Sequence, residues 1–299
     1  MKSLARDLLR GYLARCPISE GKGLLYRALA EALLPGEREV IASLAPGFRM
    51  VLDLTETTQR EMFYFGTYER KESVLIRRIL RPGDVFWDIG ANLGYYTLLG
   101  AACVGPTGRV VAFEPFPAAW ARLQRNVGLN TFPQVRLVNA AVSSGAGTGN
   151  LYFHRNVPDG IASLDIPNSH LLSVACRTLS LDGFVADGTE RPPTVMKIDV
   201  EGSEKTVLDG AVGLLSGPTP PMFLLEMEDD QFARHGTSKL EIQAMLFRLR
   251  FAAYQLVGRR WVFCRDVGTA RSRNVFWASP ASELHRARLQ AAGISRGHV

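Results

Sequence analysis

From residue 84 onward, short apolar runs alternate with stretches whose apolar residues recur at helical spacing. The runs predict buried strands at 85–89, 110–113, 135–142, 194–200, 222–227, 254–257, 261–264 and 274–278. The stretches predict helices at 95–103, 118–129, 203–215, 240–251 and 281–292. A strand-helix-strand order of this kind predicts an α/β fold with a mostly parallel sheet that helices cover on both faces.

Two regions depart from this alternation. The first 80 residues predict helices at 4–13, 24–34 and 72–80 and a strand at 48–54, so we expect an N-terminal extension that covers the substrate, followed by the main domain at 81–299. After a polar, glycine-rich break at 143–149, alternating segments at 151–155 and 174–179 predict an inserted hairpin.

Composition indicates a soluble globular protein, with 46% apolar and 21% charged residues. The net charge of +6 arises at the chain ends, because residues 28–258 hold 21 basic and 25 acidic side chains. A groove for nucleic acid would need clustered Lys and Arg on the body of the protein, so we expect no nucleic-acid partner.

The four cysteines are too widely spaced for a zinc site and too few to stabilise a chain of this length by disulfides. We interpret them as reduced packing residues of a cytoplasmic protein. Charged residues interrupt the first fifteen positions, and no apolar run reaches the length of a transmembrane segment.

The most informative segment is the turn that follows the strand at 85–89. It reads Asp88-Ile89-Gly90-Ala91-Asn92-Leu93-Gly94-Tyr95-Tyr96-Thr97, and the next strand ends at Glu114-Pro115. Ligands of open α/β sheets bind beyond the carboxyl ends of the strands. An acid at the end of the second strand is placed to accept hydrogen bonds from a ribose diol, so the segment predicts a nucleoside site.

Asp88 indicates which nucleoside this is. A dinucleotide turn reads G-x-G-x-x-G and is free of carboxylates, because a pyrophosphate rests there. Here the middle glycine is replaced by Asn92, and the carboxylate of Asp88 would repel an anion but attract a sulfonium or ammonium group. The turn therefore favours S-adenosylmethionine over NAD.

Together these segments resemble the FkbM family of S-adenosylmethionine-dependent methyltransferases. The resemblance also includes Asn139-Ala140-Ala141-Val142 and, most distinctively, Lys197-Ile198-Asp199-Val200-Glu201-Gly202. It implies a class I methyltransferase fold, a seven-stranded Rossmann-like sheet with one antiparallel strand, and O-methylation of a sugar or natural product. It also implies that the cofactor contacts Gly90, Gly94, Tyr95, Tyr96, Thr97, Pro115, Asn139, Ala140 and Ala141. Similar proteins often carry a histidine where this chain has Glu228.

Three acids near strand ends are candidates for proton transfer from an acceptor hydroxyl. Asp199 is the first choice as the base, with Glu201 and Glu226 behind it. Glu201 could instead stabilise the start of the following helix. The same acids could chelate Mg²⁺, although we favour a metal-free site.

Acceptor specificity is expected in the aromatic segment near residue 65 and in the inserted region at 151–173. Tyr64, Tyr68 and Glu69 are the candidates to bind a hydroxylated small molecule or glycan. Two other functions stay open. One is a nicotinamide-dependent oxidoreductase, and the other is a non-catalytic adenosyl-binding scaffold that docks on membranes through the first helix. The apolar positions of that helix, at Leu4, Leu8 and Tyr12, are as readily buried against the domain.

Overall fold

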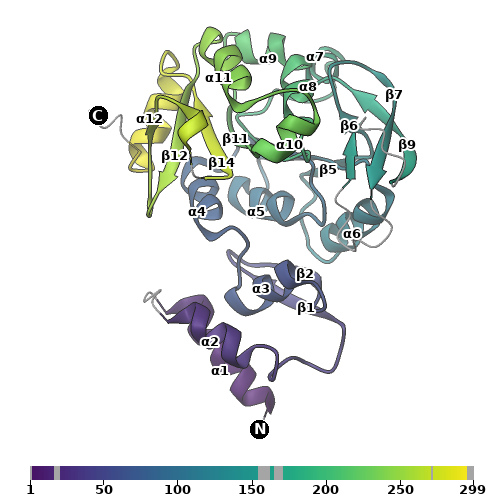
Figure 1. Cartoon of the computed structure of the whole chain (residues 1–299), viewed down its shortest axis with the longest axis vertical. Helices are drawn as coiled ribbons and strands as arrows, with labels where there is room; N and C mark the ends of the chain where they lie inside the picture. Colours follow the sequence, from purple (N-terminus) through teal and green to yellow (C-terminus); the bar gives the residue numbers. More distant parts are fainter. Residues whose placement is uncertain (1, 17–20, 154–161, 165–170, 271, 295–299) are drawn as a thin grey trace.

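A computed structural model describes residues 2–16, 21–153, 162–164, 171–270 and 272–294. Its centre is an eight-stranded sheet in the order β13-β12-β14-β11-β10-β3-β4-β5 (Figure 1). The strands are β3 (Val85–Ile89), β4 (Arg109–Phe113), β5 (Val135–Val138), β10 (Val195–Ile198), β11 (Met222–Glu226), β12 (Ala252–Val257), β13 (Arg260–Cys264) and β14 (Asn274–Ala278). The predicted α/β class is confirmed.

The sheet has one strand more than the resemblance implies. Neighbouring strands from β5 to β11 pair in parallel, and β14 pairs antiparallel with both β11 and β12. The additional strand is β13, which forms an antiparallel hairpin with β12 at the sheet edge. Two strands of the eight therefore run against the others, where the resemblance implied one.

Helices cover both faces of this sheet, because successive strand residues point to opposite sides. On β3, Trp87 packs with the helices of one face and Phe86 with those of the other. Trp87 belongs to the core beneath α7 (Leu181–Ala186), α8 (Glu204–Asp209), α9 (Val212–Ser216), α10 (Asp229–Arg234) and α11 (Lys239–Arg248). The opposite face carries α4 (Arg70–Ile79), α5 (Tyr95–Val104), α6 (Pro117–Gly128) and α12 (Glu283–Ala291).

The N-terminal elements form a further layer over α5 (Figure 1). They are α1 (Lys2–Arg15), α2 (Lys22–Leu29), β1 (Glu39–Leu44), β2 (Phe48–Asp53) and α3 (Thr57–Phe65). Phe48 of the β1-β2 hairpin meets the Tyr95 ring edge-on at 5.7 Å. Since α5 is covered by the sheet on one side and by this layer on the other, it is buried nearly all round.

A second sheet, in the order β6-β9-β7-β8, accounts for the inserted region. Its strands are β6 (Ala141–Val142), β7 (Gly147–Phe153), β8 (Ala162–Leu164) and β9 (Leu172–Leu179). The predicted hairpin is present as the antiparallel pair of β7 and β9, although residues 154–161 and 165–170 lie outside the described part. The prediction of one strand at 135–142 was wrong, because the chain leaves the main sheet after Val138 and β6 pairs with β9.

The predicted helix at 203–215 is also divided, into α8 and α9. Gly210 lies at the break, and a Cβ atom there would approach the carbonyl oxygen of Ser143 to 2.1 Å. The periodicity of the sequence continues across the break and therefore hides it. The four cysteines are free thiols. None of the helices in the described ranges is long and apolar enough to cross a bilayer.

Candidate active site

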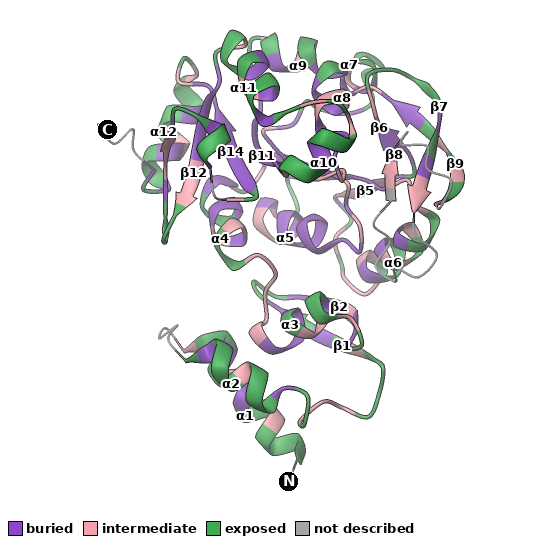
Figure 2. Ribbon diagram, viewed as in Figure 1, coloured by how far each residue is buried: buried purple, intermediate pink, exposed green. Residues whose placement is uncertain are grey.

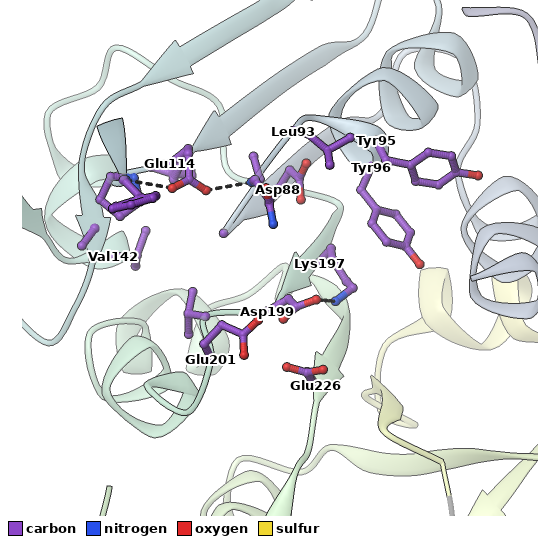
Figure 3. A pocket seen from close by; sticks show the side chains of 18 of the residues that line it. Asp88, Leu93, Tyr95, Tyr96, Glu114, Val142, Lys197, Asp199, Glu201 and Glu226 are labelled. Atoms are coloured by element: carbon purple, nitrogen blue, oxygen red, sulfur yellow. Dashed lines mark hydrogen bonds and ion pairs between the residues drawn. The ribbon is translucent and has the colours of Figure 1, made fainter. Parts of the chain in front are cut away.

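A cavity of about 310 Å³ lies beyond the carboxyl ends of β3, β4, β10 and β11 (Figure 3). The register of the sheet explains which side chains reach it. Asp88 and Lys197 are direct neighbours on parallel strands, and Leu224 is the next neighbour of Lys197. Side chains two positions further along each strand lie on the same face. Asp199 and Glu226 therefore come together at the same edge of the sheet.

Asp88 and Glu114 form one end of the cavity. Asp88 is 2% exposed and its Oδ2 accepts a hydrogen bond from Thr97 Oγ1 at 2.5 Å. The oxygens of Glu114 accept from the backbone N–H groups of Asn92 and Phe116 at 2.7 and 2.8 Å. Burial raises the pKa of Asp88 to about 6 and that of Glu114 to about 7. Asp88 is thus mostly ionised at neutral pH, as expected for a group that attracts a cation.

The glycines of the turn serve close packing within the protein. Gly90 has φ 80°, and a Cβ atom there would lie 1.8 Å from the carbonyl oxygen of Asp199. At Gly94, with φ 92°, a Cβ atom would lie 2.6 Å from Leu123 Cδ1 of α6. At both glycines the nearest obstacle belongs to the protein, namely the residue that follows β10 and a side chain of α6, and Gly90 also lines the cavity.

Most of the expected cofactor residues line the cavity. These are Asp88, Gly90, Asn92, Tyr95, Tyr96, Glu114, Pro115, Ala140 and Ala141. The other three expected residues, Gly94, Thr97 and Asn139, do not line the cavity. Thr97 contacts the cavity only through Asp88, and the Asn139 side-chain amide donates to the Glu114 carbonyl oxygen at 2.8 Å.

The acids Asp199, Glu201 and Glu226 form the other end of the cavity, and Lys197 lies between the two ends, beside Asp88 on the neighbouring strand. Its side chain is 1% exposed, and its Nζ lies 2.8 Å from Asp199 Oδ2. Burial is the largest single influence on the pKa of Asp199 and raises it. The charge of Lys197 and the hydrogen bonds to Asp199 together outweigh burial, so the net pKa lies below the usual range. Asp199 is therefore ionised at neutral pH, although it lies among other acids.

The pKa values of Glu201 and Glu226 are raised, in contrast to that of Asp199. Burial and the adjacent charge of Asp199 raise the pKa of Glu226 to about 10 and that of Glu201 to about 7. One oxygen from each of these three carboxyl groups lies within 4.8 Å of the others. Glu226 is therefore protonated when Asp199 is ionised, and the two groups hold one proton between them.

Several buried oxygens at this end have no hydrogen-bond partner within the described residues. They belong to Ser203 (Oγ), Glu204 (Oε2), Glu226 (Oε2), Gln231 (Oε1) and Asn274 (Oδ1). Buried polar atoms are normally paired, so an accumulation of unpaired oxygens indicates that a ligand or water supplies hydrogen bonds there. Glu226 Oε2 is the one among them that belongs to a carboxyl group lining the cavity.

The backbone is strained around the same cavity. Glu69, Asn92 and Glu201 have left-handed φ values of 40°, 48° and 56°. Among the residues that the structure describes, the only other non-glycine residue of this kind is Arg250. Strained residues of this type concentrate at functional sites, where surrounding contacts hold them.

Two of the three residues expected to bind the acceptor line the cavity. Tyr68 packs edge-on against Tyr95 and Tyr96, and Glu69 accepts a hydrogen bond from the Tyr96 hydroxyl at 2.6 Å. Tyr64 is instead fully buried, and its hydroxyl donates to the Ala30 carbonyl oxygen at 2.7 Å. The expectation for Tyr64 is corrected, because the helical turn of α3 points its ring into the N-terminal core.

Sequence reasoning assigned no role to Lys197 or Arg273, which both line the cavity. A lysine inside an otherwise apolar strand was the available signal, since a buried charge requires partners. Arg273 forms an ion pair with Glu228, and its Nη2 lies 3.4 Å from Glu226 Oε1, so the position where similar proteins often carry histidine is occupied here by an acid bound to arginine. Nothing local to Arg273 in the sequence predicts this contact.

The residues present fit an adenosyl group with a cationic centre. Each Glu114 oxygen uses one lone pair for a backbone N–H and keeps another for a ribose hydroxyl. Apolar side chains of Val142, Leu151 and Leu164 line the cavity beyond it and can pack against a base. The buried carboxylate of Asp88 suits an ammonium or sulfonium group and disfavours a diphosphate.

Comparisons with known proteins agree with this geometry. Hexuronic acid methyltransferase AglP of Haloferax volcanii is 33% identical over 154 residues, which are 49% of this chain and 59% of that protein. 31-O-demethyl-FK506 methyltransferase FkbM of Streptomyces tacrolimicus is 32% identical over 162 residues, which are 44% of this chain and 60% of that protein. The 2-O-methyltransferase NoeI of Sinorhizobium fredii is 26% identical over 188 residues, which are 58% and 73% of the two chains.

The chain thus spans about 60% of the length of the first two relatives. Among solved structures, methyltransferase FkbM from Methylobacillus flagellatus KT matches with a TM-score of 0.41 and 17% identity, over 75% of this chain and 55% of that one. The family profile described as the methyltransferase FkbM domain matches residues 88–256, from near the end of β3 to near the end of β12. Because this match includes more than half of the chain, the protein belongs to the FkbM methyltransferase family.

Proposed function

We propose that this protein is an S-adenosylmethionine-dependent O-methyltransferase whose acceptor is a hydroxyl group of a sugar, glycan or natural product. The observation that carries the proposal is the pairing, in one cavity, of a nucleoside end at Asp88 and Glu114 with an ionised carboxylate at Asp199. The three relatives named above are methyltransferases named for a hexuronic acid, for 31-O-demethyl-FK506 and for a 2-O position, and they support the same reaction class.

The donor end is formed by residues that hold the cofactor. Glu114 accepts the ribose hydroxyls, and Asp88 attracts the positively charged part of the methionine moiety. S-adenosylmethionine supplies a methyl group that is bonded to a positively charged sulfonium sulfur. The cavity walls then fix the distance between donor and acceptor, which is the main requirement of an in-line displacement.

Asp199 is proposed as the base. It is the acid of this end whose pKa lies below its usual range, and a base must be ionised before it can take a proton. The proton of Glu226 is shared with Asp199, and the Oε2 atom of Glu226, which lacks a partner in the described residues, is suited to accept a hydrogen bond from a hydroxyl of the acceptor. Glu201, with a pKa of about 7, is the alternative base.

In the proposed methyl transfer one bond forms and one breaks. The acceptor oxygen forms a bond to the methyl carbon while the carbon–sulfur bond breaks, and that electron pair stays on sulfur. The hydroxyl proton moves to the carboxylate of Asp199. The products are the methyl ether, S-adenosylhomocysteine and a proton that Asp199 releases to solvent.

The positive charge at this end comes from Lys197 and Arg273. Lys197 already occupies one side of Asp199, and Arg273 Nη2 lies 3.4 Å from Glu226 Oε1. We therefore propose transfer without Mg²⁺ at these acids. The N-terminal extension, residues 1–80, is proposed to cover the acceptor, because Gln59 and Met62 of α3 line the cavity together with Tyr68 and Glu69.

Calorimetric titration of the purified protein with S-adenosylhomocysteine and, separately, with NADH tests the donor site. Binding of S-adenosylhomocysteine alone is expected. Binding of NADH alone would identify a nicotinamide oxidoreductase and reject the proposal.

Incubation with methyl-labelled S-adenosylmethionine and a panel of monosaccharides, glycosides and macrolides tests the acceptor. Label should enter a hydroxyl-bearing compound as an alkali-stable methyl ether. Donor binding without transfer to any member of the panel would instead favour an adenosyl-binding scaffold.

A further inference from the structure

Helix α1 carries two separate apolar stripes. Residues four apart lie on one face of a helix. Leu9 and Leu13 form one stripe, which is buried against the protein. Leu4 and Leu8 belong to the other, which Tyr12 continues, and they are 67% and 66% exposed. The alternative that this second stripe is buried against the domain is therefore wrong.

Helix α2 adds to the exposed apolar surface. Leu24 is 68% exposed, and Leu25 and Leu29 on the same helix are also exposed. Its buried side is formed instead by Tyr26, which packs edge-on against Tyr64, and by the neighbouring Ala30. In Figure 2 most of the ribbon of α1 and α2 has the colour of exposed residues.

Basic residues accompany these leucines. The two helices contain six basic residues and one acid, Asp7. Lys2, Arg15 and Arg27 are exposed. Arg15 lies eleven positions after Leu4, which is close to three helical turns, so it continues the exposed stripe.

Two of the remaining basic residues hold this layer in place. Lys22 is buried and donates to the Leu13 and Cys16 carbonyl oxygens at the end of α1, at 2.6 and 2.7 Å. Arg10 donates to the Phe63 carbonyl oxygen of α3 at 3.0 Å. The exposed leucines are thus presented by helices that are fixed to the rest of the protein.

We propose that this surface, defined by Leu4, Leu8, Tyr12, Leu24, Arg15 and Arg27, docks the protein on an anionic lipid bilayer. Helices with an apolar face and basic residues lie in the interface of such membranes. Charge argues against a second copy of the chain, because the same face would bring two positively charged helix pairs together. The proposal does not depend on the proposed methyl transfer.

Docking would place the cavity near the membrane. Helix α1 packs on α3, and α3 contributes Thr58, Gln59 and Met62 to the cavity wall. One helix therefore separates the docking surface from the proposed acceptor site.

Co-sedimentation of the full chain with vesicles tests the proposal. The protein should sediment with vesicles of phosphatidylglycerol and phosphatidylcholine, and less with phosphatidylcholine alone. Added salt should weaken the binding, since charge contributes to it. Failure to bind the anionic vesicles would overturn the proposal.

Variants locate the surface. The triple variant Leu4→Gln, Leu8→Gln, Leu24→Gln should lower vesicle affinity at least about tenfold, because each leucine contributes apolar area. The matched control Leu240→Gln, Val257→Gln changes residues that are each 56% exposed elsewhere and should bind as wild type. Equal loss in both variants would place the lipid contact elsewhere.

Two further measurements complete the test. Melting temperature and S-adenosylhomocysteine affinity should be unchanged in the triple variant, which separates docking from folding and from the donor site. Analytical ultracentrifugation distinguishes the occupant. A dimer in wild type that the triple variant abolishes, together with no vesicle binding, would assign the surface to a second copy and overturn the lipid proposal.

Discussion

Lys197 and Asp199 are two residues apart, lie on the same face of the sheet, and form an ion pair of 2.8 Å between a fully buried ammonium and a carboxylate that opens to the cavity. The ion pair stabilises the charged form of both residues. Lys197 gains the partner that its burial requires, and Asp199 stays ionised beside Glu201 and Glu226. The chemistry of the site therefore depends on a residue that a ligand need not touch.

Removal of the ammonium by Lys197→Met should raise the pKa of Asp199, because the nearest compensating charge is lost. The acidic limb of kcat, measured with saturating donor, should move upward by about 1 to 3 pH units. Lys205→Met is the matched control, since Lys205 forms an ion pair with Asp209 outside the cavity. An unchanged profile in Lys197→Met would show that the pair does not control ionisation.

Substitution of the proposed base, Asp199→Asn, should lower kcat about 100-fold to 10,000-fold with little change in S-adenosylhomocysteine affinity. Glu201→Gln should retain most activity. The wild-type pH profile provides a second criterion. With Asp199 as the base, kcat stays level below pH 7, whereas a fall centred near pH 7 would assign the role to Glu201, whose pKa is about 7.

At the donor end, Asp88→Asn should weaken S-adenosylhomocysteine binding about 10-fold to 100-fold, because a charge-assisted contact is lost. Since the pKa of Asp88 is about 6, acidification below pH 6 should weaken binding to the wild type and leave the variant less affected. Isothermal titration of the wild type and the variant with S-adenosylhomocysteine from pH 5 to 8 measures the loss of affinity and its pH dependence. Equal pH dependence in the two proteins would exclude Asp88 as the titrating group.

Thermal stability of the ligand-free protein should rise on mild acidification. Burial raises the pKa of Asp88 to about 6 and that of Glu114, Glu201 and Glu204 to about 7. A carboxyl whose folded pKa exceeds its unfolded value stabilises the fold below the unfolded pKa, and this contribution is lost as pH rises through the folded pKa. His285 opposes the trend, because burial lowers its pKa to about 4.

Because five carboxyl groups, these four and Glu226 with its pKa of about 10, act against one histidine, Tm should rise by about 2 to 6 °C between pH 8 and pH 5.5. Scanning calorimetry at constant ionic strength measures the change. Glu204→Gln, which keeps an acceptor for the Val200 and Gly202 N–H groups, should reduce the slope, and the exposed Glu241→Gln should not. A Tm that falls steadily with acidification would contradict the prediction.

Gly90→Ala should destabilise the fold by about 3 to 5 kcal/mol, because a Cβ atom would collide with the Asp199 carbonyl oxygen and the residue has positive φ. Gly188→Ala separates the cost of the steric collision from the cost of the positive φ. Gly188 has φ 72° with open space around it, so its cost should be about 1 kcal/mol of backbone strain. Chemical denaturation of both variants gives the comparison, and equal losses would show that the close contact is unimportant.

The sequence predicted most of the sheet and one wall of the site. Strand β3 was predicted with its observed bounds, because the apolar run ends at a glycine turn. The break after Val138 and the division at Gly210 were missed, since each depends on contacts with distant segments. The strand β1 was also missed, although its partner β2 follows directly in the chain. Tyr64 was misplaced for the same reason, because local pattern does not tell which aromatic residues of a helix face a cavity.

By itself, the sequence determined the strand and helix order, the glycine turn, and the acids that end adjacent strands. These features are local, and periodicity and spacing express them directly. Tertiary structure alone decided that Arg273 reaches Glu226, which residues of the N-terminal layer line the cavity, and which leucines of α1 stay exposed. It also set the ionisation of the three acids, because burial and the charge of a neighbouring side chain act through distance in space, which strand register fixes and residue spacing does not.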